Sequence, residues 1–211
     1  MKQSQKSKLS YDKILNAAIA EFGTKNYENA SLNNICNDNN ISKGLIYHNF
    51  ENKDELYLCC VNECFKNITA YLSNAEYTAD DFQENMKKLL ELRYQFFSEY
   101  PYYSNIFFNT VLQPPKHLIK QIKQIRSEFD EFNLKQYEVA LKSVTLRDGI
   151  TIDEAMEYFF VFQEMFNGYF ICKAYENTDF NSLIQDHEMK LSKILNIMLY
   201  GIIIHNNSEE K

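Results

Sequence analysis

A length of 211 residues suits one large domain or two small ones, and a chain of this size folds without needing disulfides or metal. Five Gly and three Pro are too few for a β-rich or loop-rich protein. No apolar run approaches the length of a membrane span, and no apolar core follows the basic N-terminus, so we expect a cytoplasmic chain without membrane contact. The five Cys include no CxxC pair, which predicts free thiols and no metal site.

Charge is distributed unevenly along the sequence. Residues 1–53 hold seven Lys against five acidic residues, a net charge of +2. The whole chain carries −7, so the remainder carries −9. A basic N-terminal segment on an acidic body indicates that this segment alone meets a polyanion.

The first predicted helix begins at Ser10, whose hydroxyl can cap it. Its apolar stripe follows at a spacing of four residues: Ile14, Ala18 and Phe22. Gly23 comes directly after this stripe, so we expect it to end the helix with a positive φ.

Two short helices follow, separated by a tight turn. Ser31 is placed to cap the first of them, and Ser42 caps the second, which runs to about Asn49. Asn40 precedes the second helix, and Asn is the non-Gly residue that best tolerates a left-handed turn. The segment therefore predicts a helix-turn-helix.

The rest of the chain predicts longer helices, giving an all-α fold of about nine. Asn52 with Glu55, Thr151 with Glu154, and Ser182 with Gln185 form capping-box patterns. The predicted spans are about 53–73, 79–100, 101–113, 116–146, 151–175 and 182–204. We expect a helix-turn-helix domain at 1–52 and a second helical domain at 53–205, whose roles as the DNA-binding domain and as the ligand-binding and dimerisation domain are implied by the family resemblance described below.

The second helix of the helix-turn-helix has the side chains that a DNA contact requires. Gly44 lets the backbone approach the duplex, and Lys43 adds a cation near the helix N-terminus. Tyr47 and His48 lie one turn further along, where they can reach phosphates or base edges. Lys53 is within reach of the same DNA backbone.

The stretch from Ile14 to Leu56 resembles the DNA-binding domain of the TetR family of transcriptional regulators. The matching elements are Ala17-Ala18, Phe22, Gly23, Tyr27, Ser31, Ile35, Ser42-Lys43-Gly44, Tyr47, Phe50 and Lys53. Two positions depart from the family pattern. The turn, usually Ala-Gly-Val-Ser, is Asn39-Asn40-Ile41-Ser42, and Asn49 stands where Tyr or His is frequent.

This resemblance implies a two-domain, all-helical homodimer that represses transcription from a palindromic operator in double-stranded DNA. The last two long helices would form a four-helix dimer bundle, and a small molecule bound in the C-terminal domain would release the DNA. No cofactor is implied. The DNA contacts implied by the matching positions are Ser31, Ser42, Lys43, Gly44, Ile46, Tyr47, His48 and Lys53.

The C-terminal part is rich in large aromatic side chains, which suit a hydrophobic or aromatic effector. Glu91 and Glu164 are acids that could meet a cation. The helix at 151–175 is apolar on more than one face, as expected of a helix packed on both its own core and a partner. The candidate effector contacts are Tyr94, Phe97, Phe107, Phe108, Tyr137, Phe162 and Phe166.

Several alternatives remain open at this point. Ile46 can point into the core instead of toward DNA, and the aromatic residues can be core residues. Cys60 and Cys64 could form a thiol or metal sensor, although both lie on an apolar stripe where Cys acts as a small hydrophobe. A helical small-molecule carrier or interaction protein without DNA binding is the rival function. Common enzyme motifs are absent, so we expect no catalytic activity.

Overall fold

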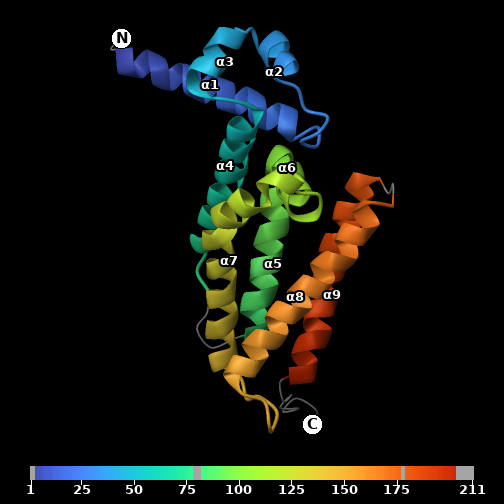
Figure 1. The fold of residues 1–211 in the computed structure, drawn as a ribbon. Coiled ribbons are helices and arrows are strands. Elements are labelled where there is room, and N and C mark those ends of the chain that lie inside the picture. Colours follow the sequence, from blue (N-terminus) through green and yellow to red (C-terminus); the bar gives the residue numbers. More distant parts are fainter. Residues whose placement is uncertain (1–2, 78–81, 177–178, 203–211) are drawn as a thin grey trace. The chain divides into compact units, whose positions relative to one another are not determined.

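The computed structural model describes residues 3–77, 82–176 and 179–202 (Figure 1). Nine α-helices and one 3₁₀ turn account for most of these residues, which confirms the expected all-α fold. No helix within the described ranges is long and apolar enough to cross a membrane. The elements are α1 (Gln3–Phe22), α2 (Leu32–Asn39), α3 (Lys43–Asn49), α4 (Lys53–Ser73), α5 (Phe82–Glu99), α6 (Pro101–Leu112), η1 (Lys116–Leu118), α7 (Ile119–Lys142), α8 (Ile152–Ala174) and α9 (Phe180–Ile202).

The chain divides into two compact units. Unit 1 comprises Met1–Ala70 and Phe96–Phe129, and unit 2 comprises Tyr71–Gln95 and Asp130–Lys211. The expected boundary after residue 52 does not coincide with this division. The reason is that α6 packs on α1, where the Asn105 side-chain amide donates to the Gly23 carbonyl at 2.7 Å.

The N-terminal part of unit 1 is formed by α1, α2 and α3, which pack on one another. Their inward faces bury Ile14, Phe22, Ile35 and Ile46, all at most 2% exposed. The predicted start of α1 at Ser10 is wrong, because the helix already includes Gln3. Residues 3–9 contain no Gly or Pro and consist largely of good helix formers, so nothing in this segment stops the helix.

Gly23 follows α1 as expected, but for a different reason. Its φ is not positive, since Asn40 and Gly149 are the residues with positive φ in the part of the chain described. A Cβ at position 23 would instead lie 2.5 Å from the Tyr102 Cβ and 2.7 Å from the Ile19 carbonyl oxygen. Glycine is therefore required here by the close approach of α6 to the end of α1.

Unit 2 contains α8 and α9, which lie side by side (Figure 1). One part of its core joins α7 to α8, where the Tyr137 and Phe159 rings stack at 3.9 Å. The capping box of Thr151 and Glu154 forms as predicted at the start of α8. The predicted box at Ser182 is wrong, because α9 begins earlier and Asp179 accepts the Ser182 backbone N–H at 2.9 Å.

Candidate nucleic-acid interface

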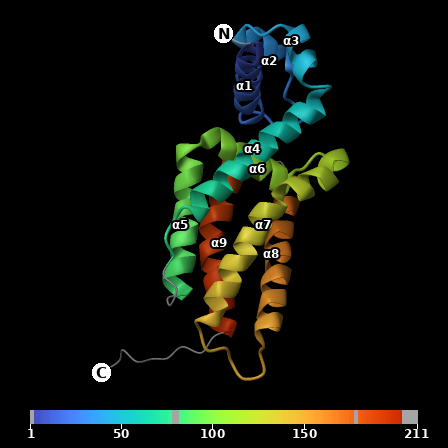
Figure 2. The same ribbon diagram turned by 90° about the vertical axis from the view of Figure 1, so that its left-hand side faces the viewer.

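The turn between α2 and α3 has the geometry expected of a helix-turn-helix. Both helices lie against α1 (Figure 2). The Ser31 hydroxyl accepts the Asn33 N–H at 3.1 Å, and the Ser42 hydroxyl accepts the Leu45 N–H at 3.2 Å. Asn40 has φ 51° and ψ 50°, the left-handed conformation predicted for it. Both helices are therefore capped by their own sequence, and α3 begins abruptly after the turn.

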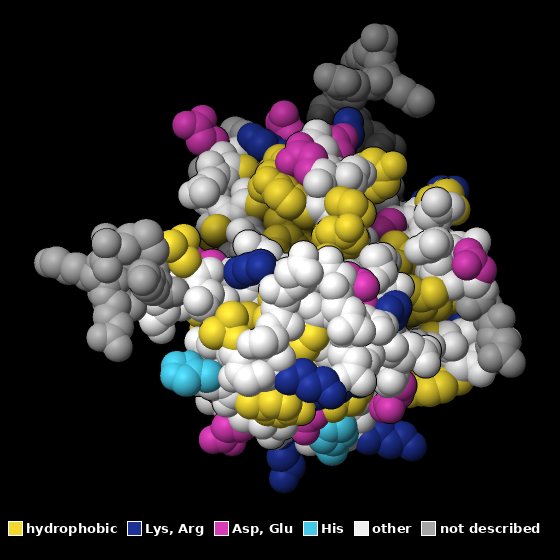
Figure 3. Space-filling view, turned by 90° about the horizontal axis from the view of Figure 1, so that it is seen from above, with side chains coloured by type: hydrophobic (Ala, Val, Ile, Leu, Met, Phe, Trp, Pro, Cys, Tyr) yellow, Lys and Arg dark blue, Asp and Glu magenta, His cyan; other side chains and the backbone are white. Residues whose placement is uncertain are grey.

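The outer face of α3 is open to solvent and contains no acidic residue. Lys43, Gly44, Tyr47 and His48 are all exposed, with Tyr47 at 57%. A Cβ at Gly44 would meet nothing within 4 Å, so the backbone is accessible from outside at this position. Figure 3, viewed from above, shows Lys, Arg and His side chains among many uncharged ones, with acidic side chains between them.

Ile46 does not belong to this exposed face. Its side chain is 1% exposed and lies on the inner side of α3, whereas Tyr47 and His48 are exposed. Phe50, which caps the end of α3 and donates its backbone N–H to the Ile46 carbonyl, is also buried, at 2%. The prediction that Ile46 contacts DNA is therefore wrong, because the core of the domain holds its side chain.

Lys53 begins α4 and is held by a group of residues that the sequence analysis did not single out for this purpose. Its ammonium nitrogen lies 4.4 Å from the centre of the Tyr27 ring. The Tyr27 hydroxyl donates to Asp54 Oδ1, and His117 Nε2 lies 3.1 Å from Asp54 Oδ2. Partial burial lowers the pKa of Lys53, while the Tyr27 hydrogen bond is the main cause of a lowered pKa at Asp54.

Glu21 is a second residue that sequence reasoning missed. Its side chain is buried at 8% exposure, and its Oε1 accepts the Ser31 backbone N–H at 2.9 Å and the Asn34 amide at 3.1 Å. The Lys25 ammonium adds a bond of 2.8 Å. Glu21 thus fixes the start of α2 against α1. The pattern that could have indicated this role is a single acidic residue on the apolar face of a helix.

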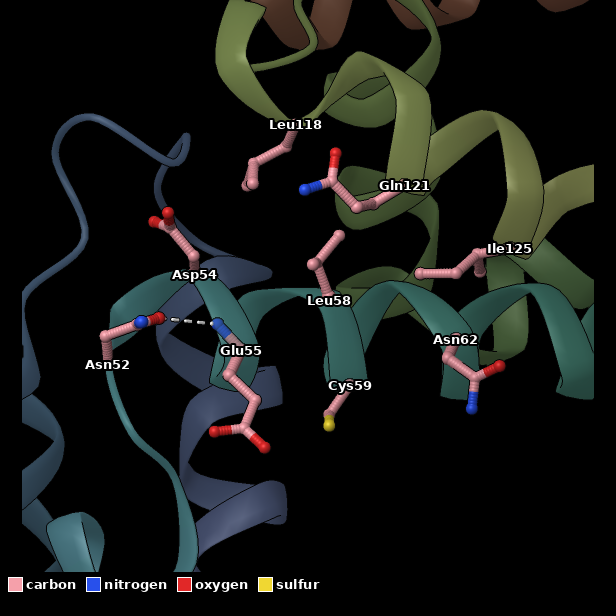
Figure 4. A pocket seen from close by; sticks show the side chains of 9 residues that line it. All are labelled: Asn52, Asp54, Glu55, Leu58, Cys59, Asn62, Leu118, Gln121 and Ile125. Atoms are coloured by element: carbon pink, nitrogen blue, oxygen red, sulfur yellow. Dashed lines mark hydrogen bonds between the residues drawn. The ribbon is translucent and has the colours of Figure 1, made fainter.

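An open groove of about 460 Å³ runs along the first turns of α4 in unit 1 (Figure 4). The Asn52 side-chain oxygen accepts the Glu55 N–H at 2.9 Å, and the Glu55 carboxylate accepts the Glu51 N–H at 2.6 Å. The predicted cap of α4 is thus present, with its return bond one residue earlier. The groove is lined by Asn52, Asp54, Glu55, Leu58, Cys59, Asn62, Leu118, Gln121 and Ile125.

The seven aromatic residues predicted to contact an effector are divided between the two units. Phe97, Phe107 and Phe108 are buried in unit 1, with ring centres 5.0–5.3 Å apart. In unit 2, Phe162 and Phe166 are neighbours on α8, with ring centres 6.1 Å apart. The remaining two lie elsewhere in unit 2: Tyr137 is buried against Phe159, and Tyr94 is 65% exposed.

Unit 2 also buries a charged group beside the aromatic rings of α8. Arg93 donates two bonds to the Glu188 carboxylate, at 3.0 and 3.2 Å, and His187 Nδ1 lies 3.0 Å from the same carboxylate. Burial would raise the pKa of Glu188, but Arg93 outweighs it and lowers the pKa to about 2. This ion pair therefore joins α5 to α9 across the ordinary pH range.

Cys60 and Cys64 of α4 do not have the surroundings of a thiol sensor. Cys60 and Cys64 are both 0% exposed, and burial raises the pKa of both thiols. A reactive cysteine requires an accessible thiolate that its surroundings stabilise, whereas the surroundings of these two residues are buried and favour the neutral thiol. In the described ranges, no three His, Cys, Asp or Glu side chains lie close enough together to hold a metal ion.

The N-terminal segment matches a known family. Residues 14–60 fit the family described as "Bacterial regulatory proteins, tetR family". The negative transcriptional regulator IcaR of the icaADBC biofilm operon in Staphylococcus epidermidis is 36% identical over 61 residues, which is 29% of this chain and 33% of IcaR. The TetC protein of transposon Tn10 in Escherichia coli is 31% identical over 71 residues, or 34% of this chain and 36% of TetC. The match thus spans about a third of each curated relative.

Solved structures with the same fold extend over nearly the whole chain. A TetR family regulator from Agrobacterium tumefaciens has a TM-score of 0.62 at 14% identity, over 89% of this chain and 97% of that one. FadR from Bacillus subtilis, solved in complex with stearoyl-CoA, has a TM-score of 0.57 at 13% identity, over 92% and 100%. At such identities the likeness concerns the fold alone.

Proposed function

We propose that the chain is a regulator of the TetR family and a sequence-specific DNA-binding repressor of transcription, because residues 14–60 fit that family and 61 residues are 36% identical to IcaR. The curated relative IcaR is named as a negative regulator, which supports repression. Regulation of this kind is carried out in the cytoplasm, where bacterial DNA lies. The family consists of transcriptional regulators, and we assign no catalytic step to the chain.

The observation that carries this proposal is the exposed face of α3. A seven-residue helix presents a Lys, a Gly, a Tyr and a His to solvent without any acidic side chain, although the chain as a whole carries −7. The Ser42 cap already accepts the Leu45 N–H, so the contribution of the helix N-terminus to phosphate binding would be its partial positive charge. We expect α3 to enter the major groove, with Tyr47 and His48 toward bases and Lys43 toward the backbone.

A homodimer is the second part of the proposal, because one such helix makes too few contacts for specific binding. The partner would be a second copy packed on α8 and α9. Besides its buried face, α8 carries an exposed apolar stripe at spacings of three and four residues, formed by Tyr158, Val161, Met165 and Tyr169, between 47% and 71% exposed. On α9, Met189 and Ile197 are also exposed. Such a stripe is typical of a helix that packs on a partner.

The third part concerns release from DNA. We propose that a hydrophobic or aromatic small molecule binds C-terminal to the DNA-binding segment and favours the form that does not bind the operator. Stearoyl-CoA in the B. subtilis FadR structure and the name of a γ-butyrolactone receptor of the same fold support such an effector. The seven aromatic residues named above give two separate candidate sets for this contact, one in unit 1 and one in unit 2.

A binding-site selection tests the proposal. The purified protein is mixed with a pool of random DNA duplexes, and the bound sequences are enriched over several rounds. The affinity of the protein for the most enriched sequence is then measured over a series of salt concentrations. We expect a palindromic site, a steep fall in affinity with salt, and weaker binding of this site by Tyr47→Ala. No enrichment and no salt-dependent binding would favour the rival function, a helical carrier without DNA binding.

A further inference from the structure

The residues around Lys53 form a continuous chain of contacts within unit 1. The ammonium of Lys53 lies over the Tyr27 ring, and the Tyr27 hydroxyl is bonded to Asp54. The other oxygen of Asp54 faces His117 of η1. The His117 ring also meets the Tyr27 ring edge-on, with centres 5.6 Å apart. Four residues from three separate segments therefore meet at the first turn of α4.

Each contact restricts the next one. Tyr27 is packed edge-on against the buried Tyr57 at 5.0 Å, so its ring has a fixed place. The hydroxyl bond to Asp54 fixes the direction of the ring axis, and the edge-on contacts with Tyr57 and His117 restrict the rotation of the ring about that axis. The contact of His117 with the other oxygen of Asp54 restricts the orientation of the carboxylate. The ring face then holds the ammonium by a cation–π interaction. A lysine on a free surface has many rotamers, whereas this one is confined before any ligand arrives.

On the basis of the proposed DNA binding, we propose that Tyr27, Asp54 and His117 are positioning residues that hold the Lys53 ammonium ready for a DNA backbone phosphate. Lys53 is partly buried, so it has already lost some of the water that a phosphate contact would displace. A confined and partly dehydrated cation loses less entropy and less hydration on binding a phosphate than a free lysine does. Removing the Tyr27 ring should thus weaken DNA binding only through Lys53.

A double-mutant cycle tests this inference on a fluorescent duplex of random sequence, so that no operator needs to be known. We expect Lys53→Met to lower affinity and to reduce the salt slope by about one unit. Tyr27→Leu should lower affinity by about two- to five-fold. In the Lys53→Met background the same change should have almost no effect.

Lys43→Met provides the matched control. Lys43 is also predicted to contact a phosphate, and none of the described contacts joins it to Tyr27. Tyr27→Leu should keep its full effect in that background. The milder Tyr27→Phe and His117→Gln variants retain most of the packing, and each should cause a smaller loss that also disappears without Lys53. These variants keep the test valid if Tyr27→Leu does not fold.

Two outcomes would overturn the inference while leaving the proposed function intact. One is an equal loss from the Tyr27 variants with and without Lys53, which would mean that the ring acts on the fold of the domain. The other is unchanged affinity and salt slope for Lys53→Met in a chain that binds DNA. Absence of salt-dependent binding to any duplex by the unaltered chain would instead overturn the proposed function, and the inference with it.

Discussion

Two glycines of unit 1 have opposite surroundings. A Cβ at Gly23 would collide with the backbone of α6 and with the Ile19 carbonyl, whereas a Cβ at Gly44 would extend into open space. Neither residue has a positive φ, so the conformational freedom of glycine is not the reason for either. Gly23 is required by the packing of the folded chain, whereas nothing in the packing around Gly44 requires a glycine.

The two alanine substitutions should therefore separate stability from binding. Gly23→Ala should destabilise the chain by about 2 kcal/mol, because overpacking forces α6 away from α1. Gly44→Ala should leave stability unchanged or slightly raised, since alanine favours a helix, but it should weaken DNA binding by adding a methyl group at the contact. Urea unfolding and a duplex-binding titration measure the two effects. A Gly44→Ala variant with unaltered affinity would show that α3 does not approach DNA closely at this point.

Glu21 gives the second prediction at this scale. Burial by itself would raise the pKa of Glu21, but the bonds from Lys25, Ser31 and Asn34 outweigh it, and the pKa lies below its ordinary value of 4.5. A carboxyl with a lowered pKa in the folded state stabilises the fold above that ordinary value. This contribution is lost as the pH falls through the lowered pKa.

The variant Glu21→Gln should remove that dependence on pH. At pH 7 we expect a loss of about 2 kcal/mol, because an uncharged amide accepts weaker bonds and turns its own donors toward other donors. Between about pH 5 and pH 3, the stability of the unaltered chain should fall more steeply than that of the variant. Unfolding curves at several pH values measure both slopes. Parallel slopes would mean that other carboxylates dominate acid unfolding.

At the scale of elements, the turn between α2 and α3 depends on one residue in a left-handed conformation. Asn40 has the single positive φ among the described non-glycine residues. We expect Asn40→Gly to leave stability the same or slightly higher, and Asn40→Val to lower it by about 1–2 kcal/mol, since a β-branched side chain opposes this conformation. Thermal unfolding of the two variants provides the measurement. Equal stability would mean that the turn tolerates another geometry.

Elements set by neighbouring residues could be predicted from the sequence. The caps at Ser31, Ser42 and Thr151 and the turn at Asn40 involve partners within five residues, and all of them form. The predicted helix starts at Ser10 and Ser182 were wrong. Before Ser10, good helix formers extend the helix upstream, and before Ser182, Asp179 caps the helix instead. A single pattern cannot decide between two such starts, because the choice depends on the stability of the whole helix.

Contacts between distant segments could not be predicted in the same way. The pairing of His117 with Asp54 joins residues 63 apart, and nothing in either local pattern indicates the other. For the same reason, aromatic spacing did not distinguish rings that close on one another, such as Phe107 and Phe108, from rings that line a cavity. Ile46 shows why the inner and outer faces of a short helix are hard to assign from sequence. Successive residues are rotated by about 100° about the helix axis, so neighbouring positions can lie in the core and on the surface.

At the scale of the whole molecule, the proposed function requires that two copies of the chain assemble. One copy of α3 exposes four candidate contact residues, too few for specific recognition of an operator. A dimer doubles this number, and its two-fold symmetry matches a palindromic site. The stripe on α8 is the surface that a second copy would bury. Loss of the dimer should therefore lower operator affinity far more than affinity for random duplexes.

Met165→Glu tests this link, because Met165 is the most exposed member of the stripe at 71%. A carboxylate there would be buried without a partner in the proposed dimer, so we expect a monomer at micromolar concentration. Val139→Glu on α7 is the control, since it adds the same charge to a 45% exposed apolar site outside the stripe. Sedimentation measures the mass, and titrations with the selected site and with random duplex measure the two affinities. A Met165→Glu chain that stays dimeric would mean that the interface lies elsewhere. A monomer that keeps full affinity for the selected site would mean that recognition does not need two copies of α3.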